Sequence, residues 1–315
     1  MAEPLHIAIT GGSGFIGSNV VDALVAEGHR VTVLDVRPAH RRDVGFVQLD
    51  ITDVDALATA FEGVDVVFHL AAVSNITAAF DRPLDAIAIN VLGTTNVWEA
   101  ARRCGVRRAV LASTVWVYAG ALGPGPFDEE TPFHLPGAGH IYTSSKIAAE
   151  MVVHNYQELY GQAFTILRYG IPYGPRMREA LVIPQFIRRA LEGQPITING
   201  DGSQFRNYVY VADLCDAHIR ALAPAAENEV INLEGTEPVT VLRLAETIRS
   251  IVGDRVVIEH VPARVGDYGG KEVSAAKALR LLGWAASTPF EEGMRRTIES
   301  YIEGHNGPTG TRLVP

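Results

Sequence analysis

The sequence has few cysteines. Its 315 residues include two, Cys104 and Cys215, each in a helix-like stretch. Neither has a CxxC motif or a metal-ligand spacing beside it. We therefore expect two reduced, buried thiols and no disulfide framework or metal site.

The sequence also lacks the signals of export and of membrane insertion. The stretch MAEPLHIAIT enters a strand directly, without the basic and apolar regions of a signal peptide. No apolar run approaches the ~18 residues that a membrane span requires. These absences predict a cytoplasmic protein with no membrane partner. The final GTRLVP resembles a linker with part of a protease site, so residues 307–315 are expected to be a tail outside the fold.

A basic stripe is the third missing feature. The formal net charge is -9, and the acidic residues are dispersed. This excludes most nucleic-acid-binding classes, although an anionic substrate stays possible where a few arginines converge. The chain is 47% hydrophobic and 20% charged. That composition is sufficient for a large core in one big domain or two smaller ones.

Short apolar runs alternate with amphipathic stretches along the first half of the chain. The runs are rich in Val and Ile and read as buried strands at 5–10, 30–35, 45–50, 64–71, 107–113 and 163–169. Helical patterns lie between them at 15–27, 53–61, 84–104 and 142–160. This alternation predicts an α/β fold with a doubly wound parallel sheet, the Rossmann arrangement.

The pattern changes from about Gly170, where Pro, Gly and Arg become frequent. We predict a Rossmann domain over 1–169, with the chain returning to it at about 207–233. A smaller α+β C-terminal domain over 170–306, made mainly of 170–206 and 234–306, is expected to bind the substrate.

A glycine-rich turn, AITGGSGFIGSNV, follows the first strand and opens the first helix. Glycine permits the tight turn and a close approach of the backbone to a pyrophosphate. The helix start then offers N–H groups and a positive dipole end to the phosphates. We expect this turn to hold a dinucleotide through Gly11, Gly14, Phe15, Ile16 and Gly17.

An acidic residue ends the second strand. Asp35 stands where a carboxylate would bind a ribose 2′-hydroxyl and repel a 2′-phosphate, so NAD is favoured over NADP. Arg37 lies nearby and could serve a 2′-phosphate, so the choice stays open at this point.

A tyrosine and a lysine share one helix face. Tyr142 and Lys146 are four residues apart in HIYTSSKIAAEM. A free tyrosine has a pKa of ~10, and an ammonium within ~4–6 Å can lower it by ~1–3 pH units. Such a phenol could act as a catalytic base. The same pair is also common in ordinary half-buried helices, so the spacing alone does not decide.

Two hydroxyls strengthen the catalytic interpretation. Ser113 and Thr114 end the fifth strand, and groups at the carboxyl ends of strands in a doubly wound sheet face the ligand crevice. A hydroxyl there could bind the substrate oxygen that Tyr142 deprotonates. The glycine turn, the hydroxyl and the Y-x-x-x-K pair appear in the correct order along the chain and at sensible spacing.

These motifs resemble the extended short-chain dehydrogenase/reductase family, the NAD-dependent sugar-nucleotide epimerases and dehydratases. The resemblance covers Ile7 to about Tyr301. It rests on TGGSGFIG, LDIT, HLAA, INVLGTTNVWEAA, STVWVY, YTSSK, LRYGIPYGP, GDGSQFRNYVYVADL, VPARVGD and LGW, in that order.

The resemblance implies roles for further residues. Lys146 would also hold the nicotinamide ribose, and Asn90 would support the cofactor groove. Arg206 and Arg264 would grip the nucleotide diphosphate, for which a guanidinium fork is suited. Residues expected to flank the adenine or line the groove are Asp50, Ile51, Leu70, Ala71 and Ala72.

The sequence departs from the family pattern at informative places. Dehydratases resemble T-D-E-V-Y-G at the hydroxyl motif, but here Thr114 is followed by Val115 and Trp116. Dehydratases of the family have an acid and a base after the threonine, and decarboxylases also have a glutamate there. A 4-epimerase needs neither an acid nor a base at these positions. Ala119, Gly170 and Ile171 differ from the usual residues and predict a changed sugar pocket.

The resemblance thus predicts an NAD-dependent epimerase that acts at C4 of a nucleotide-diphosphate sugar, of the UDP-glucose or UDP-uronic acid type. Two alternatives stay open: a dehydratase or oxidoreductase that releases a keto product, and a non-catalytic NAD-binding sensor. The family implies a homodimer in which the helices at 84–104 and 142–160 pair.

Overall fold

The computed structural model describes residues 3–262 and 270–305. By contacts the chain divides into two compact units. The first comprises Met1–Tyr169, Cys215–Leu233 and Val273–Trp284, and the second comprises Gly170–Leu214, Glu234–Glu272 and Ala285–Pro315.

A seven-stranded sheet forms the centre of the first unit, in the order β10-β6-β5-β4-β1-β2-β3. All of its strands are parallel. The predicted doubly wound parallel sheet is thereby confirmed. Its strands are β1 (His6–Thr10), β2 (Arg30–Asp35), β3 (Gly45–Gln48), β4 (Val66–His69), β5 (Arg108–Thr114), β6 (Phe164–Tyr169) and β10 (Glu229–Leu233).

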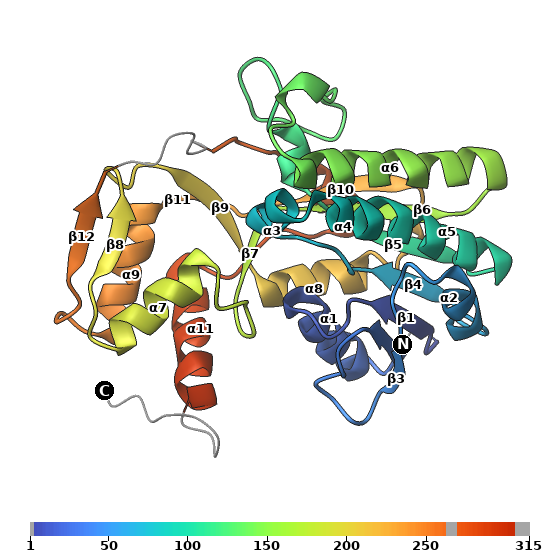
Figure 1. The fold of residues 1–315 in the computed structure, drawn as a ribbon, viewed down its shortest axis with the longest axis horizontal. Coiled ribbons are helices and arrows are strands. Elements are labelled where there is room, and N and C mark those ends of the chain that lie inside the picture. Colours follow the sequence, from blue (N-terminus) through green and yellow to red (C-terminus); the bar gives the residue numbers. More distant parts are fainter. Residues whose placement is uncertain (1–2, 263–269, 306–315) are drawn as a thin grey trace. The chain divides into compact units, whose positions relative to one another are not determined.

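Helices cover both faces of this sheet. Figure 1 shows α5 (Thr94–Arg103) and α6 (Ile141–Tyr160) along one face and α1 (Phe15–Ala26) on the other. Buried parallel sheets need such cover, which is why β4 and β5 are buried along their whole length. The other helical segments are α2 (Val54–Ala60), α3 (Ile76–Asp81), α4 (Pro83–Ile87), α10 (Ala276–Leu282) and the short turns η2 (Val115–Tyr118), η3 (Leu135–Gly137) and η4 (Pro224–Ala226).

Local chemistry explains where the longest helix begins and ends. The ring Nδ1 of His140 accepts a hydrogen bond from the Thr143 backbone N–H at 3.3 Å and so caps the start of α6. The helix ends at Gly161, whose φ of 68° is the left-handed conformation that glycine adopts without strain. The residues between them carry the predicted tyrosine–lysine pair.

The predicted single helix at 84–104 is wrong in detail. The structure has α4, then a π-helical segment η1 (Ala88–Gly93), then α5. Gly93 lies against Ile51, and an added Cβ would come within 2.5 Å of the Ile51 Cδ1 atom. The wider π turn coincides with the inward-facing amide of Asn90, and π segments of this kind are frequent at functional sites.

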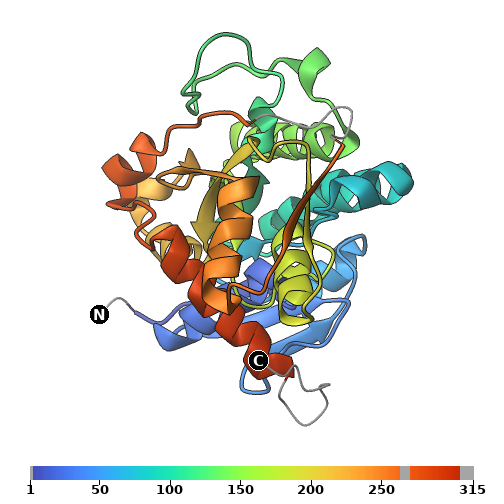
Figure 2. The same cartoon turned by 90° about the vertical axis from the view of Figure 1, so that its left-hand side faces the viewer.

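The described part of the second unit contains two small sheets and three helices. One sheet has the order β11-β9-β7 and the other pairs β12 with β8. Helices α7, α9 and α11 lie beside them, as Figure 2 shows. The bounds are β7 (Ile171–Tyr173), β8 (Ile196–Asn199), β9 (Phe205–Tyr210), β11 (Pro238–Thr240), β12 (Ile258–Val261), α7 (Val182–Leu191), α9 (Val241–Val252) and α11 (Phe290–His305), with α8 (Val211–Arg220) spanning the division between the units.

The division into units differs from the expected domains in two stretches. Residues 207–214 belong to the second unit, because β9 pairs with β7 and β11 rather than with the large sheet. Residues 273–284 belong to the first unit, where α10 lies beside β10. Neither pairing is visible in a local sequence pattern.

Among the described residues, no helix combines the length and the apolar character that crossing a bilayer requires. Cys104 and Cys215 are not joined in a disulfide, and the Cys104 Sγ donates to the Ala58 carbonyl at 3.1 Å. Burial raises the pKa of Cys104, which makes it less reactive.

Candidate functional site

The strand order reverses between β1 and β4, and ligands of open α/β sheets bind at such a point. Successive strands run outward from β1 on one side and from β4 on the other, so the connections diverge at their carboxyl ends. The glycine turn leaves β1 at this point. Gly11 has a φ of 73°, and a Cβ on it would lie 2.5 Å from the Ala71 backbone N. Only glycine fits here.

The other glycines shape a cradle at the start of α1. A Cβ on Gly17 would lie 2.2 Å from the Gly11 carbonyl oxygen, so this glycine allows the turn to close on the helix. A Cβ on Gly14 would meet little except that same oxygen at 3.2 Å. The open space beside Gly14 lets a ligand approach the backbone.

The first turn of α1 supplies donors to this space. Its N-cap, Gly14, has no side chain to cap it. Phe15 and Ile16 begin the helix, and the first N–H groups of a helix have no partner within it. A pyrophosphate satisfies such groups, and the helix dipole favours its charge. The observed cradle therefore fits a dinucleotide.

Asp35 lies beside the turn, as the sequence predicted. Its carboxylate accepts from the Ser13 backbone N–H at 3.0 Å and from the Arg37 backbone N–H at 3.0 Å. The Arg37 guanidinium is exposed and stands 3.8 Å from the same carboxylate. An anion is thus held at the end of β2, and Arg37 partly balances it.

A buried histidine ties β1 to β4. The His69 Nδ1 is 2.7 Å from the Thr10 hydroxyl, and its Nε2 is 2.9 Å from the Thr94 hydroxyl. Thr94 donates to the Asn90 carbonyl at 2.7 Å, so it accepts from Nε2–H, and Nδ1 accepts from Thr10. Burial lowers the pKa of His69 to about 3, which keeps the ring neutral.

Asn90 joins three segments around the groove. Its Oδ1 accepts from the Val73 N–H at 2.8 Å, and its Nδ2 donates to the Val73 carbonyl at 3.0 Å. The Nδ2 also donates to the Ser145 hydroxyl at 2.9 Å, and Ser145 donates to the Tyr142 carbonyl at 2.8 Å. The amide therefore links the loop after β4 to the first turn of α6.

The other predicted groove residues occupy the same edge of the sheet. Leu70, Ala71 and Ala72 follow β4 and are half-buried. Asp50 is exposed and accepts from the Thr52 N–H at 2.9 Å, while Ile51 is buried under η1. The structure brings all of them into the first unit, and their contacts with a cofactor stay predictions.

Tyr142 and Lys146 lie one turn apart on α6, and both are buried. Tyr142 packs against Ala79 and Ala86. The Lys146 Nζ donates to the Ala112 carbonyl at 2.8 Å. Burial lowers the pKa of Lys146 to about 8, while the charge of Glu150 acts to raise it. The lysine is therefore a cation at neutral pH that is held in a largely dry place.

Thr114 and Ser113 diverge, because successive side chains leave a strand on opposite faces. The Thr114 Oγ1 accepts from the Trp116 N–H at 3.2 Å, which leaves its own proton for another acceptor. The Ser113 hydroxyl instead donates to the buried Glu150 carboxylate. We therefore retain Thr114 alone as the candidate substrate hydroxyl.

Sequence reasoning missed the buried ion pair between Glu150 and Arg168. The Arg168 Nη2 is 2.7 Å from the Glu150 carboxylate. Its signal was present, since Glu150 follows Lys146 by four residues and Arg168 interrupts an otherwise apolar strand. Charged residues are seldom fully buried unless they are paired.

Two arginines, Arg206 and Arg264, were predicted to bind the diphosphate. Arg206 is on β9 of the second unit, where its Nη1 donates to the Phe205 carbonyl at 2.6 Å. Arg264 lies outside the described residues, so its role stays a prediction. Among the described residues, no cluster of three or more His, Cys, Asp or Glu side chains could hold a metal ion.

Comparisons with known proteins agree with this geometry. A model of the NAD dependent epimerase/dehydratase family matches residues 7–233. UDP-glucuronate 4-epimerase of Thermodesulfobacterium geofontis is 32% identical over 311 residues, 93% of this chain and 95% of that protein. UDP-glucuronic acid decarboxylase 1 of Danio rerio is 32% identical over 319 residues, 98% of this chain and 76% of that protein.

A solved structure shows the same fold. The crystal structure of UDP-glucose 4-epimerase from Thermotoga maritima, with UDP-glucose, has a TM-score of 0.89 at 31% identity. The match covers 95% of this chain and 99% of that one. The predicted cofactor NAD is confirmed by the family, and the cradle fits it. The chain therefore belongs to the NAD dependent epimerase/dehydratase family, and it is a sugar-nucleotide enzyme of that family.

Proposed function

We propose that this enzyme interconverts two C4 epimers of a nucleotide-diphosphate sugar through a transient 4-keto sugar. The observation that carries the proposal is the composition of the site in the first unit. Tyr142, Lys146 and Thr114 supply a base, a cation and a hydroxyl. The two residues after Thr114 are Val115 and Trp116, which supply neither an acid nor a base.

The chain's residues have separate tasks in this reaction. The Lys146 ammonium favours the phenolate form of Tyr142, and the phenolate takes the proton of the sugar 4-hydroxyl. Thr114 donates to the same sugar oxygen. Bound NAD supplies the hydride acceptor and donor. Tyr142 returns its proton after the keto sugar has presented its other face, so no net oxidation occurs.

The missing acid and base distinguish this reaction from elimination. A 4,6-dehydratase must remove a second proton and expel water, and this requires further ionisable groups near the sugar. Val115 and Trp116 offer none. The decarboxylases among the relatives are the competing possibility, and the absence of a glutamate at these two positions disfavours them.

The names of the relatives support a uridine nucleotide. Two of them are a UDP-glucuronate 4-epimerase and a UDP-glucose 4-epimerase. We propose a UDP-hexose or UDP-hexuronate substrate whose diphosphate is bound by Arg206 and Arg264. The direct test is incubation with a panel of sugar nucleotides, followed by proton NMR for exchange of configuration at C4. Stoichiometric NADH, loss of CO2, or binding without turnover would each contradict the proposal.

Replacing Asp35 tests the cofactor preference. In Asp35→Asn, the repulsion between the carboxylate and a 2′-phosphate is removed. We expect the ratio of NADP to NAD affinity to rise by about 10-fold, which corresponds to about 1.4 kcal/mol. Fluorescence titration with both dinucleotides measures it. Arg42→Gln, a neutralisation outside the turn, should leave the ratio unchanged.

We also propose a homodimer, as the family resemblance implied. Within the predicted pairing segments, α4 exposes Leu84 (82%), η1 exposes Leu92 (51%) and α6 exposes Met151 (58%). Introducing a charge by Leu84→Glu should convert a dimer into a monomer in light-scattering chromatography, because a carboxylate cannot be buried without a partner. Leu122→Glu, at a loop residue that is 75% exposed, is the matched control and should stay dimeric.

A further inference from the structure

The ion pair behind the tyrosine–lysine helix is almost completely inaccessible. The side chains of Arg168 and Glu150 are 4% and 1% exposed. Three guanidinium contacts hold the carboxylate, from Nη2 at 2.7 Å and from Nε at 3.1 and 3.2 Å. A buried pair of this kind adds little stability over an apolar pair of the same size. Its presence suggests another use.

Neutral groups complete the surroundings of the pair. Ser113 donates to Glu150, and the Arg168 Nη1 donates to the Tyr118 hydroxyl at 2.5 Å. The Tyr118 hydroxyl donates a hydrogen bond to the Asn232 Oδ1 at 3.0 Å. Burial raises the pKa of Tyr118 to about 12, so it stays neutral. The Glu150 carboxylate therefore accepts from Ser113 and from Arg168, and Arg168 is in turn held by Tyr118.

Strand β5 contacts both Lys146 and the Glu150–Arg168 pair. Lys146 donates to the carbonyl of Ala112, and the next residue of β5, Ser113, donates to Glu150. Lys146 and Glu150 are also four residues apart on α6, where side chains are neighbours. Helix and strand thus hold an ammonium and a carboxylate next to each other in a dry interior.

Other titratable groups near Lys146 do not supply this anion. His69 on β4 is neutral, as described above. Burial raises the pKa of Tyr169 on β6 far above its ordinary value, so Tyr169 is neutral as well. His154, two turns along α6, has its pKa lowered by burial. Tyr142 is the group that Lys146 is proposed to serve. Within the part of the chain that the structure describes, this leaves the Glu150–Arg168 pair as the charged groups beside Lys146.

We propose that Glu150, held by Arg168 and Ser113, is a positioning residue that keeps Lys146 protonated beside Tyr142. Glu150 provides attraction that offsets the burial of the ammonium, and Arg168 limits that attraction so that Lys146 remains available to Tyr142. The catalytic role of Glu150 rests on the proposed function. The effect of Glu150 on the pKa of Lys146 can be measured without turnover.

The sequence makes this measurement simple, because it contains only three lysines, Lys146, Lys271 and Lys277. With 13C-labelled lysine, three side-chain Cε signals are expected, and Lys271→Arg and Lys277→Arg assign them. In the wild-type protein the Lys146 signal should titrate with a midpoint of about 8. In Glu150→Gln the midpoint should fall by about 1 pH unit or more, since an opposite charge at this range is removed and Arg168 is left unbalanced.

Replacing the other partner must act in the opposite direction. In Arg168→Gln the Glu150 charge is balanced by Lys146 alone, so the Lys146 midpoint should rise above its wild-type value. General damage to the fold cannot produce opposite shifts from two halves of one pair. An unchanged midpoint in Glu150→Gln, or shifts of the same sign in both variants, overturns the proposal.

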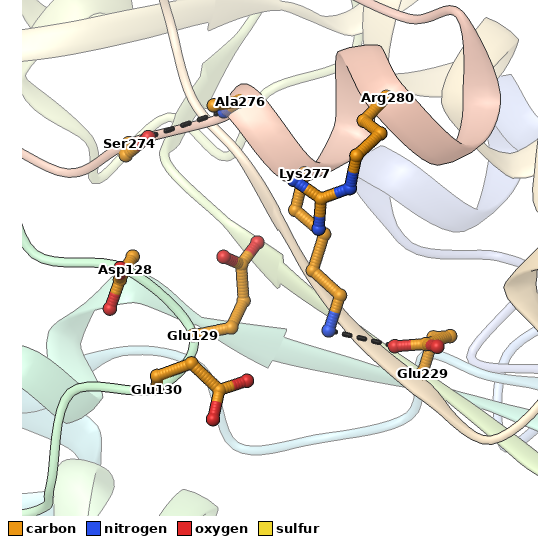
Figure 3. A pocket seen from close by; sticks show the side chains of 8 residues that line it. All are labelled: Asp128, Glu129, Glu130, Glu229, Ser274, Ala276, Lys277 and Arg280. Atoms are coloured by element: carbon orange, nitrogen blue, oxygen red, sulfur yellow. Dashed lines mark hydrogen bonds and ion pairs between the residues drawn. The ribbon is translucent and has the colours of Figure 1, made fainter.

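A surface ion pair elsewhere in the first unit provides the matched control. Lys277 on α10 is 2.7 Å from Glu229 on β10. Both residues line a pocket of about 360 Å³, and Figure 3 shows the contact between them. None of the predicted site residues lines this pocket. Glu229→Gln removes a lysine's carboxylate partner there and should leave the Lys146 midpoint unchanged.

Either single variant can fail to fold, because it leaves one buried charge unpaired. The double variant Glu150→Gln with Arg168→Met carries no such charge and removes the pair's whole field. Its Lys146 midpoint should still fall below the wild-type value, because Glu150 is the charged group that acts to stabilise the ammonium. A midpoint at or above the wild-type value in a folded double variant contradicts the proposal.

The pH dependence of kcat then distinguishes the proposed role of Glu150 from the proposed epimerase function. Where epimerisation occurs, the alkaline limb of the kcat profile should move to lower pH in Glu150→Gln and to higher pH in Arg168→Gln, with KM little changed. A purely structural role predicts lower kcat at every pH and no movement of the limb. If the NMR midpoints shift as expected and no epimerisation occurs in the wild type, the electrostatic inference stands and the proposed function fails.

Discussion

Tyr142→Phe is expected to abolish epimerisation while NAD remains bound. The substitution removes one hydroxyl and keeps the ring that packs against Ala79 and Ala86. Positioned proton transfer contributes about 10²- to 10⁴-fold to a rate, and no other described group at the site is proposed as its base. Proton NMR of C4 exchange measures the loss, and cofactor titration measures what remains.

A second tyrosine on the same helix is the control. Tyr160 ends α6 and is 56% exposed, so Tyr160→Phe should have wild-type activity. Full activity in Tyr142→Phe would refute the assignment of the base. Loss of both activity and NAD binding would show that the phenol serves the cofactor rather than the proton transfer.

Gly14→Ala and Gly17→Ala should separate cofactor binding from folding. The backbone of Gly14, with φ of −79° and ψ of 178°, suits any residue. Its new Cβ would meet the Gly11 carbonyl oxygen at 3.2 Å and little else. We expect near-normal thermal stability in Gly14→Ala. The methyl group occupies the space for the pyrophosphate, so the Kd for NAD should rise by about 10-fold or more.

The substitution at Gly17 has a different expected result. Its Cβ would lie 2.2 Å from a backbone oxygen, so the turn itself must move. Overpacking of this kind destabilises by about 1–3 kcal/mol. Gly17→Ala should therefore lower the Tm of the cofactor-free protein and also weaken NAD binding. If a stable Gly14→Ala protein binds NAD with wild-type affinity, the glycine turn is not the pyrophosphate site.

The cofactor half of the site could be predicted because its signals are local. The turn needs glycine for its conformation and its close approach to Ala71, and Asp35 follows from the end of the next strand. The tyrosine–lysine pair is a spacing on one helix. Each of these depends on residues close together in sequence, so a motif carries it.

Other features depended on partners far along the chain. In the π turn η1, Gly93 lies against Ile51 and Asn90 bonds to Val73. The helical periodicity of the sequence does not predict these contacts. The chain was expected to return to the first domain at about residue 207, but β9 pairs with β7 and β11, and the return begins at Cys215. Local apolar pattern specifies that a strand forms and leaves open which neighbour it pairs with.

The sequence by itself determined the parallel sheet, the dinucleotide turn and the order of the catalytic candidates, because periodicity, glycine geometry and helical spacing act over a few residues. Tertiary structure alone distinguished the two adjacent hydroxyls, since Ser113 donates to a carboxylate on α6 and Thr114 does not. It alone placed Arg168 from β6 against Glu150 of α6. These outcomes depend on burial and on distances between distant segments, which set the strength of every charge interaction in the interior.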